Sequence, residues 1–195
     1  SDSKKLFHEQ FPYVIPGLYK RIVDEMLVEL NLLNHQNEFI QDDLFCVGLT
    51  ETFKELMKGY KPEKHLDPLF KSLCSSSNFD AKEIKEISLK SQEEFKDKSS
   101  EDILKLLKEK NNAKLYPSRI LNLGMYLIIS GCQDLKGKNE SDTSKIISDI
   151  FEKLNLSINK AEKDIGIYKS TISKMEQAKE LIEELRIKDK KKDQK

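Results

Sequence analysis

Apolar residues recur at spacings of three and four along almost the whole chain, as they do on one side of an α-helix. The widest such stripe begins after Pro16, a residue well suited to the first turn of a helix. Its members are Leu18, Ile22, Met26, Leu30 and Leu33. A stripe this wide needs cover on more than one side. The stretch from Tyr13 to Leu33 is therefore predicted to be the central helix of the domain.

The same spacing predicts further helices, bounded by capping residues and by helix breakers. Their expected ranges are 42–57, 63–75, 81–98, a segment starting at Ser99 or Ser100, 118–129 and 144–154. Residues 4–11 are expected to form a short helical turn. Strict apolar–polar alternation, which would indicate strands, is not sustained anywhere.

Three features of these segments predict how they pack. The helix at 118–129 is apolar nearly all round, so it is expected to be fully buried against the central helix. Gly48 lies inside a helix, where it costs about 1 kcal/mol relative to Ala, and this indicates a close helix crossing. The segment 81–98 has a weak apolar stripe and dense charge, which predict a peripheral, solvated helix.

The last helix is predicted to be unusually long. It carries a heptad-like seam formed by Ala161, Ile165, Tyr168, Ile172 and Met175 and continued weakly by Ala178, Ile182 and Leu185. A helix over 158–188 would be about 45 Å long, so part of it should protrude as a coiled-coil-like arm. The chain is thus predicted to be an all-α bundle of about seven to eight helices, with a globular part at 1–156 and the long helix with its basic tail at 157–195.

The charge balance and the positions of the cysteines argue against two classes of protein, nucleic-acid-binding proteins and disulfide-bonded proteins. The 34 basic and 34 acidic residues give no net charge, so a chain-wide attraction to nucleic acid is not expected. The three cysteines are far apart, and each lies in an apolar helical context, which predicts buried, reduced thiols. No segment has the length needed to span a bilayer, and no signal peptide is expected at the N-terminal end.

Motifs for catalysis and metal binding are not found. The chain has no glycine-rich phosphate loop and no nucleophile elbow. Asp24, Glu25 and Glu29 resemble half of a dimetal carboxylate site, but that site needs a Glu-x-x-His pair and position 32 is Leu. No catalytic residue, cofactor or metal ligand is therefore predicted.

Arg119 stands at the start of the most apolar predicted helix, where a positive charge opposes the helix dipole. A partner on another helix would explain its position. We expect an interhelical ion pair with an acidic residue of the central helix, such as Asp24 or Glu25.

The long last helix has two interpretations that the residues leave open. It is either a coiled-coil arm that binds a partner or a helix that simply packs along the bundle. The basic segment after it is either a solvated end or a contact for anionic lipid headgroups, worth up to about 1 kcal/mol per Lys near a membrane.

Several stretches together resemble one known family. They are the segment from Ile15 to Glu25, the run Gly59-Tyr60-Lys61-Pro62-Glu63, and the segment from Lys163 to Leu185. On these residues the sequence resembles the thylakoid formation family, also called the Photosystem II biogenesis family, of cyanobacteria and plastids. The resemblance covers nearly the whole chain and weakens at residues 133–143 and 96–114.

The resemblance implies an all-α, non-enzymatic accessory factor in Photosystem II biogenesis and repair. Its implied place is the cytoplasmic or stromal face of the thylakoid membrane, and its implied partner is an FtsH-type membrane protease. The expected binding surface is on the long helix, at Tyr168, Lys169, Met175 and Gln177. One alternative is a peripheral thylakoid-membrane protein that binds lipid or shapes membranes directly. Another, an enzyme of unfamiliar type, would require a convergent polar cleft.

Overall fold

The computed structural model describes residues 2–110 and 115–194, and the regular structure in these residues is entirely helical. The all-α class and the long last helix are thus confirmed, while position 195 of the predicted tail lies outside the described residues. The elements are α1 (Asp2–Gln10), α2 (Gly17–Asn34), α3 (Asp43–Leu56), η1 (Glu63–His65), α4 (Leu66–Ser75), α5 (Ala81–Phe95), α6 (Ser100–Lys110), α7 (Arg119–Ser130), η2 (Gln133–Leu135), α8 (Glu140–Lys153) and α9 (Ile158–Lys192).

Side-chain caps define the starts of six described helices. Oxygen atoms accept a hydrogen bond from a backbone N–H two or three residues further on at Asp42, Asp80, Ser99, Ser118, Asn139 and Ser157. Each cap satisfies a donor that the first turn of a helix leaves unpaired. The N-terminal segment, expected as a short turn, is a nine-residue helix that buries Phe7.

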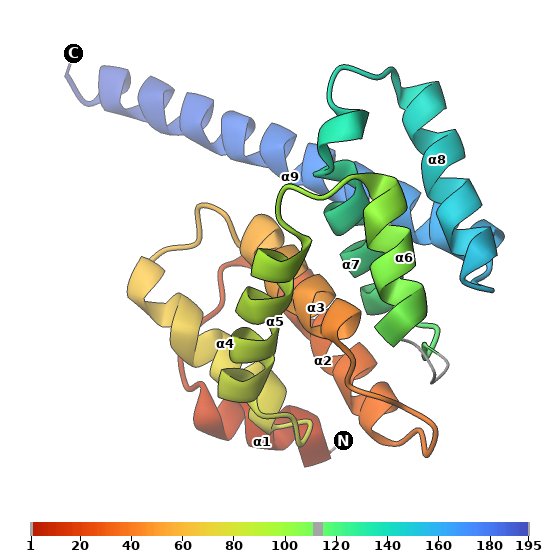
Figure 1. Ribbon diagram of the computed structural model, residues 1–195. Coiled ribbons are helices and arrows are strands. Elements are labelled where there is room, and N and C mark those ends of the chain that lie inside the picture. The colour runs from red at the N-terminus through yellow and green to blue at the C-terminus, as the bar shows by residue number, and fades with distance from the viewer. Residues whose placement is uncertain (1, 111–114, 195) are drawn as a thin grey trace.

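The centre of the bundle is α3 rather than α2, which corrects the prediction for the stretch 13–33. The most extensive contacts in the molecule are those of α3 with α7 and of α3 with α5. Figure 1 shows α3 between α5 and α7, with α2 beside it. The apolar helix at 118–129, expected against the stretch 13–33, is α7 and packs mainly on α3.

Two glycines make the crossing of α3 and α7 possible. A Cβ atom on Gly48 would collide with the backbone carbonyl of Ile120, and a Cβ atom on Gly124 would collide with the carbonyl of Leu44. The backbones of α3 and α7 therefore lie in direct contact, which only residues without a side chain permit. The close packing predicted from Gly48 is confirmed.

Helix α5 is packed rather than peripheral, because small polar side chains take the place of an apolar stripe. Ser88 and Ser91 are buried, and the hydroxyl groups of Thr50 on α3 and Ser88 on α5 are 2.6 Å apart. The Ser91 hydroxyl donates to the carbonyl of Ile87 within its own helix. Serines that satisfy their hydrogen bonds in this way let two helices approach without a wide apolar surface.

The buried apolar side chains form two clusters with α3 between them. The first is built mainly from α1 to α4 and includes Phe45 and Met57. The second is built mainly from α6 to α9 and includes Leu44 and Phe151. Tyr168 of α9 packs against both clusters. The last helix therefore crosses both halves of the bundle.

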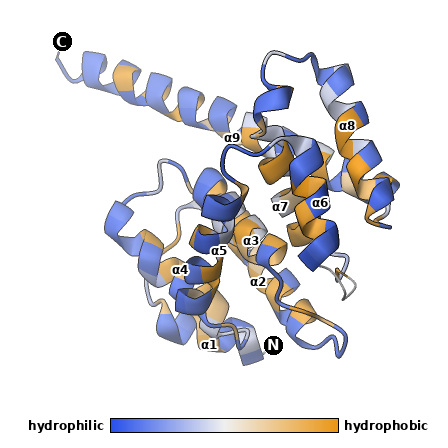
Figure 2. Ribbon diagram, in the orientation of Figure 1, coloured by the Kyte–Doolittle hydropathy of each residue, from blue (hydrophilic) through white to orange (hydrophobic). Residues whose placement is uncertain are grey.

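Helix α9 is one continuous element with a packed part and a free part. The chain turns at Asn155, whose φ is 57°, and Ser157 then caps the helix. Ala161, Ile165 and Met175 are buried, whereas all residues from Glu180 to Lys192 are exposed. We call residues 180–192 the arm. It is about 20 Å long, and it extends beyond the other elements as a mostly hydrophilic helix (Figures 1 and 2). The division at 156/157 stays a prediction.

Replacement of Gly124 by Ala tests the α3–α7 crossing. The added methyl group has no room against the backbone of α3, so we expect Gly124→Ala to lower the free energy of unfolding by about 3 kcal/mol. Gly166→Ala is the matched control, because a Cβ atom there meets nothing within 4 Å. In α9 this change should raise stability by about 0.5–1 kcal/mol. Urea denaturation of both variants measures the difference, and equal effects would contradict the close crossing.

Asp42 caps α3 at the cost of burying a carboxylate. One carboxylate oxygen accepts from the N–H of Phe45, while Oδ2 is buried without a hydrogen-bond partner among the described residues. Burial raises the pKa of Asp42 from its ordinary 3.8 to about 6, against the lowering effect of its backbone hydrogen bonds. The ionised form is therefore less stable in the fold than in the unfolded chain.

This shift predicts a pH effect of definite sign. Because the folded pKa is raised, the stabilisation from protonated Asp42 is complete below pH 3.8 and is lost as the pH rises through about 6. Asn keeps the cap without the charge. Asp42→Asn should therefore be more stable than the parent at neutral pH, by at most about 3 kcal/mol. Thermal unfolding of both proteins across this range should show the difference vanishing in acid, and a constant difference would refute the assignment.

Candidate interaction site

Arg119 joins the start of α7 to α2, but through a different partner from the one predicted. Its Nη2 and Nε atoms lie 2.5 Å and 2.9 Å from Oε2 of Glu29. The ion pair to this helix is therefore present, while Asp24 and Glu25 are corrected to Glu29. Glu25 instead pairs with Arg21 of its own helix at 2.8 Å. One helical turn separates the two partners, so the spacing alone allowed either.

A second polar contact beside this pair holds α9. The side-chain amide of Asn122 on α7 donates to Asp164 on α9 at 2.9 Å. Asp164 also acts on Glu29, whose pKa is raised mainly by burial and secondarily by this nearby charge, against the lowering effect of Arg119. The four side chains form one partly buried cluster that ties α2, α7 and α9 together.

The last anchored point of α9 is Lys179. Its Nζ donates to the backbone carbonyl of Lys58 at 2.5 Å and lies 5.8 Å from the ring centre of Tyr19. The Tyr19 hydroxyl donates to the same carbonyl at 2.8 Å. The turn after α3 bends sharply at Gly59, with a φ of 82°. A carbonyl at the C-terminal end of a helix thus accepts from both a tyrosine and a lysine, and the lysine charge suits the negative end of the helix dipole.

The four predicted contact residues on α9 differ in accessibility. Lys169 and Gln177 are exposed, Tyr168 is half-buried, and Met175 is 6% exposed. Met175 therefore packs inside the bundle and cannot belong to a binding surface, which corrects that part of the prediction. Its place in the heptad-like seam explains the burial, because the seam is the side of the helix that faces the bundle.

The arm carries charges of both signs in separate segments. Glu180, Glu183 and Glu184 precede a cationic end that consists of Arg186, Lys188, Lys190, Lys191 and Lys192, interrupted by Asp189. Apolar side chains are also exposed, and Leu181, Ile182 and Leu185 are 57%, 55% and 52% accessible. A lone helix with exposed apolar residues needs a covering partner or stays in water at some cost.

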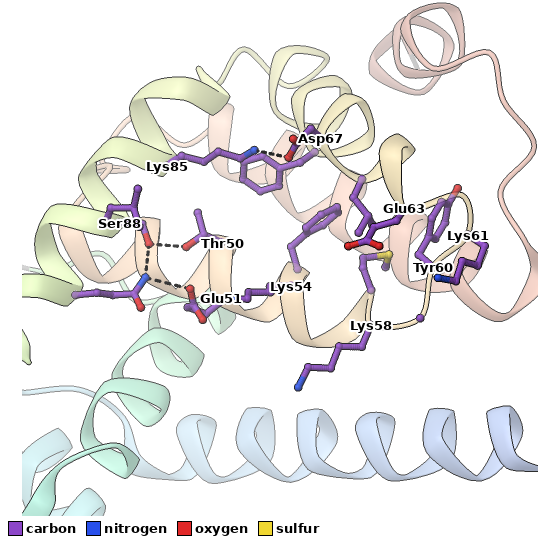
Figure 3. A pocket seen from close by; sticks show the side chains of 17 residues that line it. Thr50, Glu51, Lys54, Lys58, Tyr60, Lys61, Glu63, Asp67, Lys85 and Ser88 are labelled. Carbon is purple, nitrogen blue, oxygen red and sulfur yellow. Dashed lines mark hydrogen bonds and ion pairs between the residues drawn. The ribbon is translucent and has the colours of Figure 1, made fainter.

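A groove lies between α3, α4 and α5 and reaches the turn after α3 at Lys58 and Gly59 (Figure 3). Its volume is about 530 Å³, and its apolar wall includes Phe53, Leu66, Phe70 and Leu89. Lys85 and Asp67 form an ion pair of 3.0 Å across one side. Sequence reasoning missed this groove because its walls come from three helices whose relative placement no local pattern specifies.

The polar groups of the groove are largely engaged with one another. Thr50 bonds Ser88, and the Gln92 amide donates to Glu51 at 3.1 Å (Figure 3). The side chain of Lys58 points toward α9 in the same view and pairs with Glu55 at 2.7 Å. The arrangement can bind an apolar group, and it provides no nucleophile–base pair of the kind that acyl or phosphoryl transfer requires.

The cysteine thiols are buried and free, as predicted. Burial raises the pKa of Cys46 and of Cys74 to about 12 and that of Cys132 to about 11. These thiols are therefore protonated at neutral pH and are poor nucleophiles. Residues 2–110 and 115–194 contain no group of three or more His, Cys, Asp or Glu side chains arranged to hold a metal ion.

No described helix is both long enough and apolar enough to cross a membrane.

These features define a helical bundle whose long last helix continues beyond the packed core as an exposed, mostly hydrophilic arm (Figure 2). The sequence matches the family described as Thylakoid formation protein over residues 1–195. The chain belongs to this family, and the resemblance drawn from the segment Ile15 to Glu25 is confirmed. The family places the chain among the factors of thylakoid formation.

Curated relatives and one solved structure agree with this assignment. Protein Thf1 of Prochlorococcus marinus (strain MIT 9312) is 81% identical over 192 residues, which are 98% of this chain and 96% of the relative. Protein Thf1 of Synechococcus sp. (strain CC9605) is 37% identical and covers 94% and 86% of the two chains. The solved structure of Psb29 superposes with a TM-score of 0.85 at 25% identity, covering 100% of this chain and 98% of Psb29.

Removal of Arg119 tests the polar cluster. Arg119→Met leaves Glu29 partly buried and unpaired, so we expect a loss of about 2 kcal/mol, less than for a fully buried pair because Arg119 reaches solvent. The loss should grow with rising pH, since an unpaired Glu29 can protonate in acid. Denaturant unfolding at several pH values measures both effects.

Two further variants make the test specific. The double variant Glu29→Gln/Arg119→Met removes both charges and should recover part of the loss. Arg21→Met removes an exposed arginine from a neighbouring pair on α2, and it should change stability by less than about 0.5 kcal/mol. Equal losses for Arg21→Met and Arg119→Met would contradict the role given to the cluster.

Proposed function

We propose that this chain is a non-enzymatic adaptor at the cytoplasmic or stromal face of the thylakoid membrane. It acts in Photosystem II biogenesis and repair, and its partner is an FtsH-type membrane protease. Membership of the thylakoid formation family supports the membrane and the process. The association with the protease comes from the resemblance of the sequence motifs.

The observation that carries the proposal is the division of α9 into an anchored part and a free part. The anchored part is held by Asp164 and Lys179, while every residue of the arm is exposed. A helix that continues out of a packed bundle is already ordered before it meets a partner, so binding costs little conformational entropy. We assign the contact surface to the arm and to the exposed side of α9 at Lys169 and Gln177.

A second candidate function is direct binding of the membrane surface. Five cations within residues 186–192 favour it, because clustered lysines and arginines are attracted to anionic headgroups. In this case the chain is a peripheral protein that contacts lipid without a protein receptor. Flotation with vesicles of anionic lipid at physiological salt separates the two functions, since an adaptor alone stays in the unbound fraction.

The adaptor proposal predicts that the arm is needed for recovery of the protease. A chain ending at Lys179 keeps every buried residue of α9 and should unfold like the full chain. Affinity capture from thylakoid extracts should then recover about tenfold less FtsH-type protease, as expected when about 1.4 kcal/mol of contact energy is lost. A chain ending at Lys192 keeps the arm and serves as the matched control. Undiminished recovery by the chain ending at Lys179 would exclude the arm as the contact surface.

A further inference from the structure

The apolar side chains of the arm continue the seam by which α9 packs on the bundle. Ile172 and Met175 face the bundle, and the next positions at the same spacings are Ala178, Ile182 and Leu185. Leu181 falls at the flanking position just before Ile182. We call Ala178, Ile182 and Leu185 the strip. Ile182 and Leu185 lie beyond Lys179, the last anchored residue of α9, on the part of the helix that extends past the other elements (Figure 1).

The charged residues are sorted around the strip by position. With Ile182 and Leu185 as inward residues of a heptad, the charged flanking positions are occupied by Lys179, Arg186 and Lys188. Glu180, Glu183 and Glu184 fall at the outward positions of the same heptads. The charged positions that flank the strip are thus all cationic, and Leu181 occupies the remaining flanking position, although the arm as a whole carries both signs.

From this arrangement we propose that the strip docks an amphipathic helix of another protein, with apolar inward residues and acidic flanking residues. This inference rests on the proposed function, because it names the chemistry of the segment that the arm receives. Flanking charges determine which helices pair in a coiled coil, and a cationic border selects an acidic partner. The arm is a preformed helix, so the docking helix adds apolar contact without having to nucleate the arm.

A second copy of this chain does not fit the strip. In an antiparallel pair the cations at positions 179, 186 and 188 would lie opposite cations of the second copy. In a parallel pair Asp189, the next inward residue after Leu185, would meet its own copy across the seam. Like charges at these positions destabilise pairing.

A flat lipid surface fits less well than a helix. A helix that lies in a lipid surface buries a wide apolar face, whereas the strip is a single line of three residues with Asp189 at the next inward position. A single helix, about 10 Å across, can lie alongside the arm next to the bundle.

Two synthetic helices of several heptads test the inference with the full chain. Both carry Leu at the inward positions, and they differ only in having Glu or Lys at the flanking positions. We expect the Glu helix to bind at least about tenfold more tightly than the Lys helix in a fluorescence anisotropy titration at physiological salt. Ile182→Ser/Leu185→Ser should abolish binding of the Glu helix.

A charge-reversal pair supplies the matched control. Arg186→Glu/Lys188→Glu should reverse the preference, so that the Lys helix binds better by about tenfold. Lys190→Glu/Lys191→Glu changes the net charge equally but at outward positions, and it should keep the preference for the Glu helix within about twofold, because only the screened long-range field changes. If both pairs of substitutions act alike, the sorting of charge around the strip has no role.

Other outcomes overturn the inference directly. The inference is wrong if the chain binds both helices equally or binds neither. It is also wrong if the chain sediments as a dimer and the Ile182→Ser/Leu185→Ser variant does not, or if the chain floats with anionic vesicles and this variant does not. The helix-binding assays and the capture of FtsH-type protease test different claims. If the purified chain does not prefer the Glu helix but protease capture still requires the arm, only the inference about the docking helix is wrong. If the purified chain prefers the Glu helix but protease capture does not require the arm, the proposed function is wrong and the docking inference remains.

Discussion

The contact of two backbones at Gly48 and Gly124 sets the geometry of the rest of the molecule. It brings α3 and α7 closer than any pair of helices with side chains between them could approach. Helix α7 presents Asn122 to α9, and the turn after α3 presents the carbonyl of Lys58 to the same helix. The spacing of these two anchors, and with it the path of α9, is fixed by the crossing.

Charge is abundant in this chain, but few of the charges contribute much to stability. Most ion pairs are exposed, as in Arg21 with Glu25, and such pairs are worth little in water. The pair of Glu29 and Arg119 differs, because the carboxylate is only 18% exposed. The pair lies where α2, α7 and α9 meet. Its main effect is therefore on the relative placement of these three helices.

The sequence predicted what depends on local chemistry. Helix starts at Asp42, Asp80 and Ser157 follow from the capping preferences of those residues, and burial of the seam of α9 follows from its spacing. The family resemblance was carried by short motifs and needed no knowledge of packing. The close crossing at Gly48 could also be anticipated, because a helix interior rarely retains a glycine without a packing reason.

What could not be predicted depends on how helices meet. Helix α5 has too few apolar residues to indicate burial, yet Ser88 and Ser91 are buried through hydroxyl hydrogen bonds. The predicted partners of Arg119, Asp24 and Glu25, lie about one turn before the observed partner, Glu29. The sequence could not distinguish them, because acidic residues on one face of a helix differ only in their position along the helix axis. The anchoring role of Lys179 could not be predicted from the sequence either. Its acceptor is a backbone carbonyl, and every residue has one, so no side chain marks the contact.

Helix α9 continues without a break across Lys179, so a small rotation there moves the whole arm. Its anchored part is held at Asp164 and Lys179, and its free part reaches about 20 Å further as one rigid helix. A rotation of about 10° at Lys179 would displace the tip by about 3 Å, enough to move a side chain out of contact distance. Small changes in how the turn at Gly59 is packed are thereby magnified at the far end of the chain.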